Sequence, residues 1–322
     1  MSLTGHATLI DFRLCPLGDK QYLRYVLLDA NRFWIMNDYW QQVNQYYLGT
    51  ALAKVRKALE KHIARLSGKQ EEKKISFVDN PNYPEISTID SPPALQELCS
   101  FFGLSDFERD VLLLCAGMEL DTGWAALCAA SQGEPKRDYP TFSLAMAALD
   151  TPCWSALTPS APLRRWQMIE VGAGNVLTTA TLRINERVLH YLLGVSHLDE
   201  LLLPMLQPVK SQIQQTQSLL IPISSSEQVA STWSQSSLNL PIIQLCGSET
   251  TSKLAIASYV GKILGLNLYT LSAHKLPSNI NDFYQLLLLA QREAALSKSA
   301  LLLNCDDINT TDTTQIKSRS RF

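Results

Sequence analysis

The sequence predicts a protein of mixed α and α/β class, with a mainly helical first part and a partial parallel α/β domain after it. Two observations predict this. Between residues 91 and 206, short apolar segments with helix caps precede one pair of alternating segments around a Gly-rich turn. After residue 240, strand-like and helix-like segments alternate, which is the pattern of a parallel sheet with crossover helices. At 322 residues, the chain is long enough for two or three domains.

Composition and charge narrow the functional class. The formal net charge of −2 gives no general attraction to nucleic acid or to a membrane surface. The longest apolar runs, 111–116 and 286–290, are far shorter than the ~20 residues that span a bilayer, and the start of the chain has no signal-peptide pattern. Seven cysteines are scattered without a C-x-x-C pair, which predicts reduced, buried thiols. We therefore expect a soluble, cytoplasmic protein that does not bind membranes.

A long amphipathic helix is expected in the amino-terminal segment, residues 1–75. Between Asp38 and Leu66, apolar residues recur every three or four positions, as they do on the buried face of a helix. Over residues 54–66, where Glu60 is the single acidic residue, the helix carries a set of cations: Lys54, Arg56, Lys57, Lys61 and Arg65. A solvated face is the simpler interpretation of this set. Docking to an acidic partner or to nucleic acid is the alternative.

Residues 91–206 are expected to form a compact helical domain with one hairpin. Ser105 and Glu108 have capping-box spacing ahead of an apolar run, and alternating residues on both sides of 172–175 predict the hairpin. Short helices followed by a two-stranded hairpin are typical of a winged-helix domain. The candidate recognition segment, 140–150, contains no Lys or Arg, although phosphate contacts need cations. The pattern therefore favours protein docking over DNA binding.

The last region begins after a connection. Residues 207–223 are Gln-rich with a proline near either end, and we interpret them as the linker to a last domain over residues 224–322. That domain is expected to alternate strand, helix, strand, helix and strand over 241–246, 250–264, 267–271, 281–297 and 299–305.

A phosphate-binding loop is the motif suggested by the residues CGSETTSKL between the first of these strands and its helix. The pattern G-x-x-x-x-G-K-[ST] uses glycines to bring backbone N–H groups to phosphates, a lysine for charge and a hydroxyl for Mg²⁺. Gly247 and Lys253 stand at their places, so Gly247, Ser252 and Lys253 are the candidate cofactor-binding residues. Ser252 replaces the second glycine, Leu254 replaces the hydroxyl, and Glu249 adds negative charge. The motif is therefore degenerate.

Two acids follow the apolar strand at 299–305. A strand that ends in Asp306-Asp307 has the form of a Walker B element, in which the first carboxylate acts on Mg²⁺ and the second on the attacking water. This predicts Asp306 as the metal ligand and Asp306 with Asp307 as catalytic residues. Asp307 stands where Glu is more usual and is one methylene shorter. An acidic turn after a strand is the structural alternative, but the loop and the acids together favour nucleotide-binding ancestry.

The chain resembles a family of bacterial AAA-type ATPases that have a winged-helix segment, some of which are encoded with phage-tail-like contractile injection systems. The resemblance runs from about Thr50 to Asn309 and is carried by these stretches: FGLSDFERDVLLLCAGMELD, YPTFSLAMAAL, WSALTPSAPLRRWQMIEV, LRINERVLHYLLGVSHLDE and QLCGSE with LNCDD. It implies that residues 240–309 are the first, often degenerate, of two nucleotide-binding modules. Lys253 is then the Walker lysine, Asp306 and Asp307 are the Walker B acids, and ATP with Mg²⁺ is the cofactor.

The resemblance also raises a problem of strand pairing. An AAA-type sheet has the strand order 5-1-4-3-2, and this chain supplies segments for strands 1, 2 and 3 only. Strand 1, at 241–246, is therefore expected to lack both neighbours, with unpaired backbone groups along its edges. A shortened gene product, a deliberate truncation or frameshift, and a rearranged sheet in which strands 1 and 3 pair directly are the three interpretations. We favour a truncated AAA-type protein.

Three functional hypotheses follow. The leading one is the amino-terminal portion of an AAA-type ATPase, with a degenerate nucleotide site, a protein-docking or regulatory role and no ATPase activity of its own. Its expected partners are proteins, including other ATPase subunits, rather than nucleic acid. The alternatives are an active ATP-binding AAA-type ATPase that remodels protein assemblies and a winged-helix DNA-binding protein.

Overall fold

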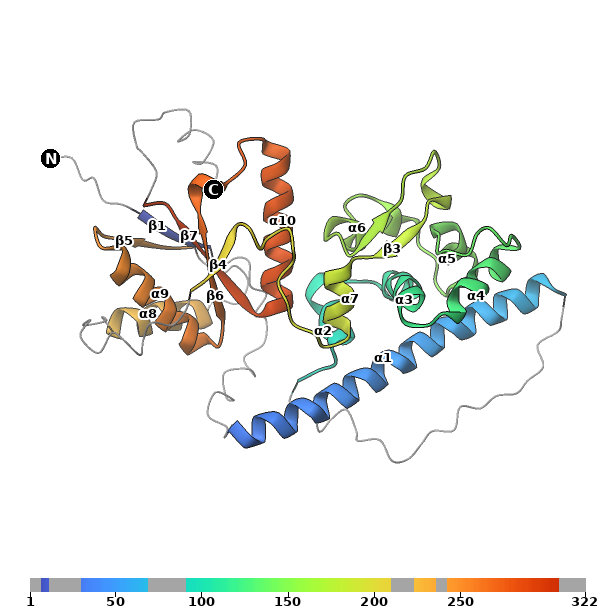
Figure 1. Cartoon of the computed structure of the whole chain (residues 1–322), viewed down its shortest axis with the longest axis horizontal. Coiled ribbons are helices and arrows are strands. Elements are labelled where there is room, and N and C mark those ends of the chain that lie inside the picture. Colours follow the sequence, from blue (N-terminus) through green and yellow to red (C-terminus); the bar gives the residue numbers. More distant parts are fainter. Residues whose placement is uncertain (1–6, 12–29, 69–90, 210–222, 236–241, 307–322) are drawn as a thin grey trace. The chain divides into compact units, whose positions relative to one another are not determined.

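The computed structural model describes residues 7–11, 30–68, 91–209, 223–235 and 242–306 (Figure 1). They divide into two compact units. The helical unit covers residues 29–196, and the sheet unit joins residues 1–28 to residues 197–322. Segments from both ends of the sequence therefore belong to one unit. The division at residue 197 also gives the sheet unit the residues 197–206, which the sequence pattern groups with the helical block.

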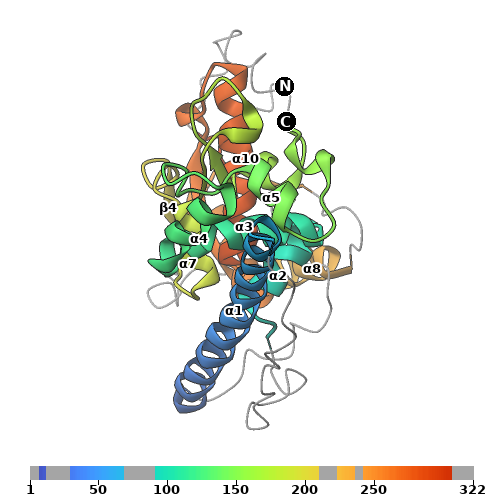
Figure 2. The ribbon, with the colours of Figure 1, turned by 90° about the vertical axis from the view of Figure 1, so that its right-hand side faces the viewer.

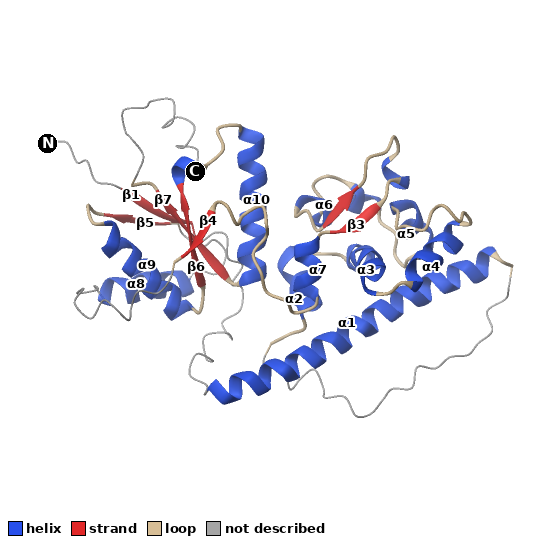
Figure 3. Ribbon diagram, in the orientation of Figure 1, coloured by secondary structure: helices blue, strands red, loops and turns tan. Residues whose placement is uncertain are grey.

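The helical unit consists of short helices and one hairpin packed on one long helix (Figure 3). Its elements are α1 (Ala30–Leu66), α2 (Ala94–Phe102), α3 (Asp106–Leu120), α4 (Gly123–Gln132), α5 (Phe142–Ala148), α6 (Pro162–Arg165), β2 (Ile169–Val171), β3 (Leu182–Ile184) and α7 (Glu186–Leu192). Two 3₁₀ turns, Trp154–Leu157 and Leu177–Thr179, lie in the connections. The long helix begins eight residues earlier than the apolar pattern indicates, at Ala30 rather than Asp38.

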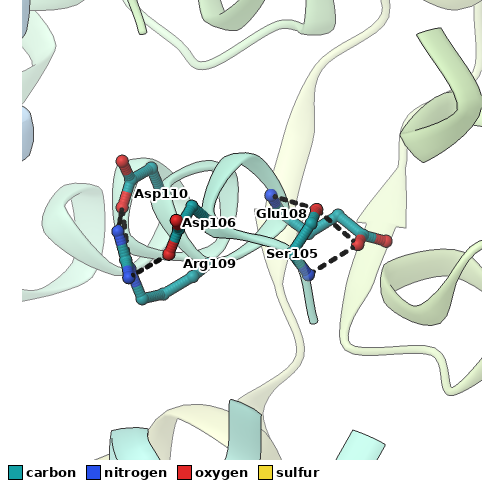
Figure 4. A network of polar contacts seen from close by, with 5 residues as sticks. All are labelled: Ser105, Asp106, Glu108, Arg109 and Asp110. Carbon is teal, nitrogen blue, oxygen red and sulfur yellow. Dashed lines mark hydrogen bonds and ion pairs between the residues drawn. The ribbon is translucent and has the colours of Figure 1, made fainter. Parts of the chain in front are cut away.

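The predicted capping box at the start of α3 is confirmed (Figure 4). The Glu108 N–H donates to Ser105 Oγ at 3.3 Å, and the Ser105 N–H donates to Glu108 Oε2 at 3.0 Å. Arg109 bonds Asp106 at 2.6 Å and Asp110 at 2.8 Å on the same turn. These contacts satisfy backbone donors at the start of the helix and place acids near its positive end. They fix where α3, the most deeply buried helix of the unit, begins.

The long helix α1 is part of the helical unit and not a separate segment. Asn44 is buried, and its side-chain amide both donates and accepts a hydrogen bond. Its Nδ2 donates to Leu192 O at 2.9 Å, and its Oδ1 accepts from the Ala94 N–H at 2.8 Å. Gln41 Nε2 donates to Leu193 O at 2.7 Å. These bonds join α1 to the start of α2 and the end of α7, because helix ends leave backbone groups that need partners.

Close packing between α3 and α4 depends on Gly117. A Cβ at this position would lie 2.4 Å from ring carbons of Trp124, which is itself buried. We expect Gly117→Ala to lower the free energy of unfolding by ~1–3 kcal/mol, because the ring must move in a packed core. Urea unfolding followed by circular dichroism measures this change.

Gly49 is the matched control, since it also lies inside a helix but a Cβ there would meet nothing within 4 Å. Gly49→Ala should raise the free energy of unfolding by ~0.5–1 kcal/mol through helix propensity. Changes of the same sign in both variants would contradict the packing argument.

The sheet unit is built on a five-stranded sheet with the order β4-β6-β7-β1-β5. Its elements are β1 (Ala7–Asp11), β4 (Leu206–Pro208), α8 (Ile223–Gln235), β5 (Ile243–Cys246), α9 (Thr250–Leu264), β6 (Asn267–Ser272), α10 (Ile280–Ser297) and β7 (Ser299–Asn304). β6 and β7 are parallel, with Asn267 opposite Ser299, as expected for strands joined by a crossover helix. One apolar cluster includes Trp233 of α8, Val260 of α9 and Leu302 of β7.

The expectation that the strand at 241–246 has no neighbour is wrong. β1 lies between β5 and β7 and is antiparallel to both, with Ala7 opposite Cys246 and Thr8 opposite Asn304. The amino-terminal strand thus supplies the backbone donors and acceptors that β5 otherwise lacks on that side. Direct pairing of β5 with β7 is not seen either, because β1 separates them.

The start of the expected linker is part of the sheet. Leu206–Pro208 forms β4, which pairs antiparallel with β6 at the edge of the sheet. Just before it, Leu202 is fully buried and Asp199 forms a buried ion pair with Arg292 of α10. The chain is therefore fixed to the sheet unit from about residue 199 to residue 208.

The cysteines in the described ranges are thiols without disulfide bonds. Cys115 and Cys128 are buried, as expected, and burial raises the pKa of both thiols. Cys153 and Cys246 are exposed instead. A hydrogen bond with the Ser155 side chain lowers the pKa of the Cys153 thiol.

Candidate functional site

The candidate loop and the first candidate acid meet at one edge of the sheet. Gly247 follows β5, Lys253 lies in the first turn of α9, and Asp306 follows the end of β7. β5 and β7 run in the same direction because both are antiparallel to β1. Their carboxyl ends therefore point to the same edge, which is where open α/β sheets bind ligands.

At the centre of this site, Lys253 forms a buried ion pair with Asp306. Lys253 Nζ lies 2.5 Å from Asp306 Oδ1, and the two side chains are only 4% and 11% exposed. The second carboxylate oxygen of Asp306 accepts a hydrogen bond from Thr250 Oγ1, also at 2.5 Å. A lysine in an aqueous phosphate site would direct its ammonium to the ligand, but here a carboxylate of the same chain holds it.

Thr250 is a site residue that the motif analysis did not identify. It lies three residues before Lys253, and residues at this spacing share one face of a helix. The motif places the metal-binding hydroxyl after the lysine, where this chain has Leu254. The structure instead brings a hydroxyl from before the lysine to Asp306. The one available signal was a Thr at i−3 from the motif lysine.

Glu249 occupies the start of α9 with its own negative charge. Its carboxylate accepts hydrogen bonds from Ser252 Oγ at 2.7 Å and from Thr251 Oγ1 at 3.3 Å. An acid at the first turn is stabilised by the positive end of the helix dipole. That end is also where a phosphate group would bind. Ser252, the residue at the place of the second glycine, therefore contacts an acid of the loop itself.

The remaining candidates do not join this group. Leu254 packs against the apolar cluster around Trp233, so it contributes no polar atom. Gly247 connects β5 to the loop. Asp307, the second candidate acid, lies outside the described residues. In the described ranges, no group of three or more His, Cys, Asp or Glu side chains is arranged to hold a metal ion.

Tested against ATP with Mg²⁺, the described residues fit poorly. Thr250 and Asp306 are a hydroxyl and a carboxylate, which suit Mg²⁺. A phosphate chain beside them needs a cation, and Lys253, the motif cation, is neutralised by Asp306. Glu249 places a further carboxylate at the helix start, where it would repel phosphate oxygens. Asp306 offsets the charge of Lys253, and Glu249 leaves this group of three side chains with an excess negative charge.

The helical unit has its own candidate surface, formed by α5 and the β2–β3 hairpin. The hairpin is antiparallel, with Ile169 opposite Ile184, and the Leu182 N–H donates to Pro140 O at 2.9 Å just before α5. Thr141 caps α5 by accepting from the Leu144 N–H at 3.0 Å. Helices α3, α4 and α5 pack against one another, and β3 packs on α3. The arrangement is therefore three helices, α3, α4 and α5, followed by the two-stranded β2–β3 wing.

Comparison with protein families identifies the domain type of the helical part of the chain. Residues 48–206 match the family model described as "Winged helix domain, variant". These residues form a winged-helix domain. Searches of curated proteins and of solved structures found no match for the chain.

The winged-helix domain as matched begins inside α1, and the structure extends the same compact unit back along that helix. Gln41 and Asn44 precede residue 48, yet both bond to the ends of α2 and α7. At the other end, residues 197–206 fall in the match but lie in the sheet unit. None of the helices that the structure describes has the length and apolar character needed to cross a membrane.

The Lys253–Asp306 pair can be tested through stability. Lys253→Met should cost ~3 kcal/mol, because it leaves a buried carboxylate without its cation. Asp306→Asn should be similarly costly, because it leaves a buried ammonium. The double variant Lys253→Met/Asp306→Asn should recover most of the loss, since the introduced amide is neutral and its oxygen can still accept from Thr250. A double-mutant cycle by urea unfolding measures the coupling, and simple additivity of the two single changes would exclude a strong pair.

The role of β1 can be tested at its centre. Leu9→Pro removes a backbone N–H and introduces a ring into a strand that has neighbours on both sides, which sheets tolerate poorly. We expect amide hydrogens of β5 and β7 to exchange at least about tenfold faster, while those of α3 keep their protection. Hydrogen exchange with mass spectrometry measures both.

Leu9→Ala keeps the N–H and serves as the control, so it should disturb β5 far less. Unchanged protection of β5 in Leu9→Pro would show that β1 does not hold this strand.

Proposed function

We propose that this protein is a docking and regulatory module related to the amino-terminal part of an AAA-type ATPase, with a nucleotide site that no longer binds nucleotide. The winged-helix domain provides the protein-docking surface, and the sheet unit serves as a scaffold. The observation that carries the proposal is the buried contact of Lys253 with Asp306.

The physical reason lies in the charges. Binding a phosphate through Lys253 would separate it from Asp306 and leave that carboxylate with the Thr250 hydroxyl as a neutral partner. Breaking a buried ion pair by removing one partner costs several kcal/mol. The bound phosphate would also approach Glu249 at the start of α9. Together these free-energy costs oppose nucleotide binding. The protein is therefore more stable as a scaffold without a bound nucleotide.

The surface of the winged-helix domain supports docking to protein. α5 exposes Ser143 and Ala147 and contains no Lys or Arg. Near the wing tip, Val176 and Leu177 are exposed apolar side chains, and Trp154 is exposed in a nearby segment of the chain. Exposed apolar and aromatic groups are typical of protein interfaces, while DNA backbones need cations.

Three of the cations near these elements already have partners within the domain, whereas Lys136 and Arg183 of β3 are exposed. Arg164 donates to Leu157 O at 2.6 Å, Arg165 lies over the Trp166 ring, and Arg137 pairs with Glu134 at 2.8 Å. A winged-helix domain is compatible with DNA binding as a class. In this chain the recognition helix, which contains no Lys or Arg, favours protein instead.

Nucleotide titration tests the proposal. Isothermal titration of the full chain with ATP and Mg²⁺ should show no binding at micromolar concentration, because Lys253 and Asp306 neutralise each other. Micromolar affinity that is lost in Lys253→Ala but kept in Lys262→Ala, an exposed lysine of the same helix, would overturn the proposal. ATP turnover lost in Lys253→Ala alone would establish an enzyme that remodels protein assemblies.

A further inference from the structure

The exposed side of α1 carries aromatic and basic residues in one line. α1 lies along the outside of the helical unit, with α2, α3 and α4 on one side of it (Figure 1). Figure 2 shows the same helix in a view turned by 90°, again at the margin of this unit. The buried side is formed by residues such as Leu48, Val55 and Leu59. The opposite side is free of other described helices of the unit.

The spacing of the exposed residues makes a continuous stripe. Tyr39, Tyr46, Thr50, Lys57 and Lys61 are all exposed and follow one another at intervals of seven, four, seven and four. Intervals of four and seven residues return to nearly the same side of a helix with 3.6 residues per turn. Lys54 and Arg65 are exposed beside the basic end of this line. We call these residues the α1 stripe: Tyr39, Tyr46, Thr50, Lys54, Lys57, Lys61 and Arg65.

The acid within the basic half of α1 has a partner outside the stripe. Glu60 lies 3.4 Å from Arg56, which also bonds Asp121 at 2.6 Å and so belongs to a separate group of charges. The stripe therefore presents two tyrosines, 38% and 45% exposed, followed by four cations. From Tyr39 to Arg65 it extends ~39 Å at 1.5 Å per residue.

We propose that the α1 stripe binds an acidic amphipathic helix of a partner protein, and this rests on the proposed docking function. A straight line of side chains on one helix is matched by a second helix lying alongside it. Opposite charges at one-turn intervals set which partner and which orientation bind. Tyr39 and Tyr46 supply large contact areas of the kind that carry most binding energy at protein interfaces.

Charge favours this partner over nucleic acid. Nucleic-acid-binding domains usually have a basic surface within a strongly basic domain, whereas this chain has a formal net charge of −2. A nucleic acid longer than the stripe would extend onto the rest of the protein, which has more acidic than basic residues and so does not attract phosphates. A single acidic helix can contact the stripe alone.

Fluorescence anisotropy with a labelled synthetic peptide tests this inference. The probe is a helix of four Glu-Leu-Ala-Ala-Glu-Leu-Gln repeats, and the comparison peptide has Gln in place of every Glu. At low ionic strength the full-length chain should bind the acidic peptide at least about tenfold more tightly than the neutral one, and added salt should reduce the difference. No binding of the acidic peptide would overturn the proposal.

Variants locate the site. Lys57→Gln/Lys61→Gln should weaken acidic-peptide binding about tenfold, and Tyr46→Ala should weaken binding of both peptides. Lys136→Gln/Lys262→Gln removes the same charge from exposed lysines elsewhere and should change affinity less than about twofold. Equal losses in the two double variants would mean non-specific attraction and overturn the proposal.

An oligothymidylate single strand is the second probe. If it binds more tightly than the acidic peptide and loses affinity in Lys57→Gln/Lys61→Gln, the stripe is a nucleic-acid surface and the proposal fails. Failure of this inference is distinct from failure of the proposed function, since the nucleotide titration depends on Lys253 and not on α1.

Discussion

Pairing of β1 with two strands at once is the constraint on which the sheet unit depends. β5 carries the loop with Lys253, β7 leads to Asp306, and β1 lies between these strands and pairs with both. The ion pair then closes a second connection at the carboxyl edge, from α9 to the end of β7. Strand pairing thus links β5 to β7 through β1, and the ion pair links α9 to the end of β7.

Short-range signals in the sequence predicted a large part of the fold. The capping box of Ser105 and Glu108, the hairpin around 172–175 and the alternation of strands and helices after 241 all depend on residues close together in the chain. β1 and β4 were missed because their partners are distant: Ala7 pairs with Cys246, and Leu206 pairs with Leu271. No local pattern records such a pairing. The tie of α1 to the winged-helix domain through Asn44 was missed for the same reason.

The candidate site, like the fold, could be predicted only in part from the sequence. Motif spacing and the alternation of strands and helices indicated that Lys253 and Asp306 belong to one site of nucleotide-binding ancestry. These patterns did not indicate that the two residues bond each other, since that depends on how closely the folded elements approach. The hydroxyl of Thr250 reaches Asp306 from a position that the motif does not use. The roles predicted for Ser252 and Asp307 in nucleotide chemistry stay predictions.

The position of β1 also sets the order in which the chain acquires its structure. The helical unit is continuous, from residue 29 to residue 196, so all of its contacts are available early in synthesis. β1 leaves the ribosome before that unit, but its partners in β5 and β7 appear only after the whole helical unit has been made. Contacts between such distant segments form slowly because loop closure must precede them. The helical unit can therefore fold while β1 still lacks its partners, and chaperones have most reason to act until β5 and β7 have been made.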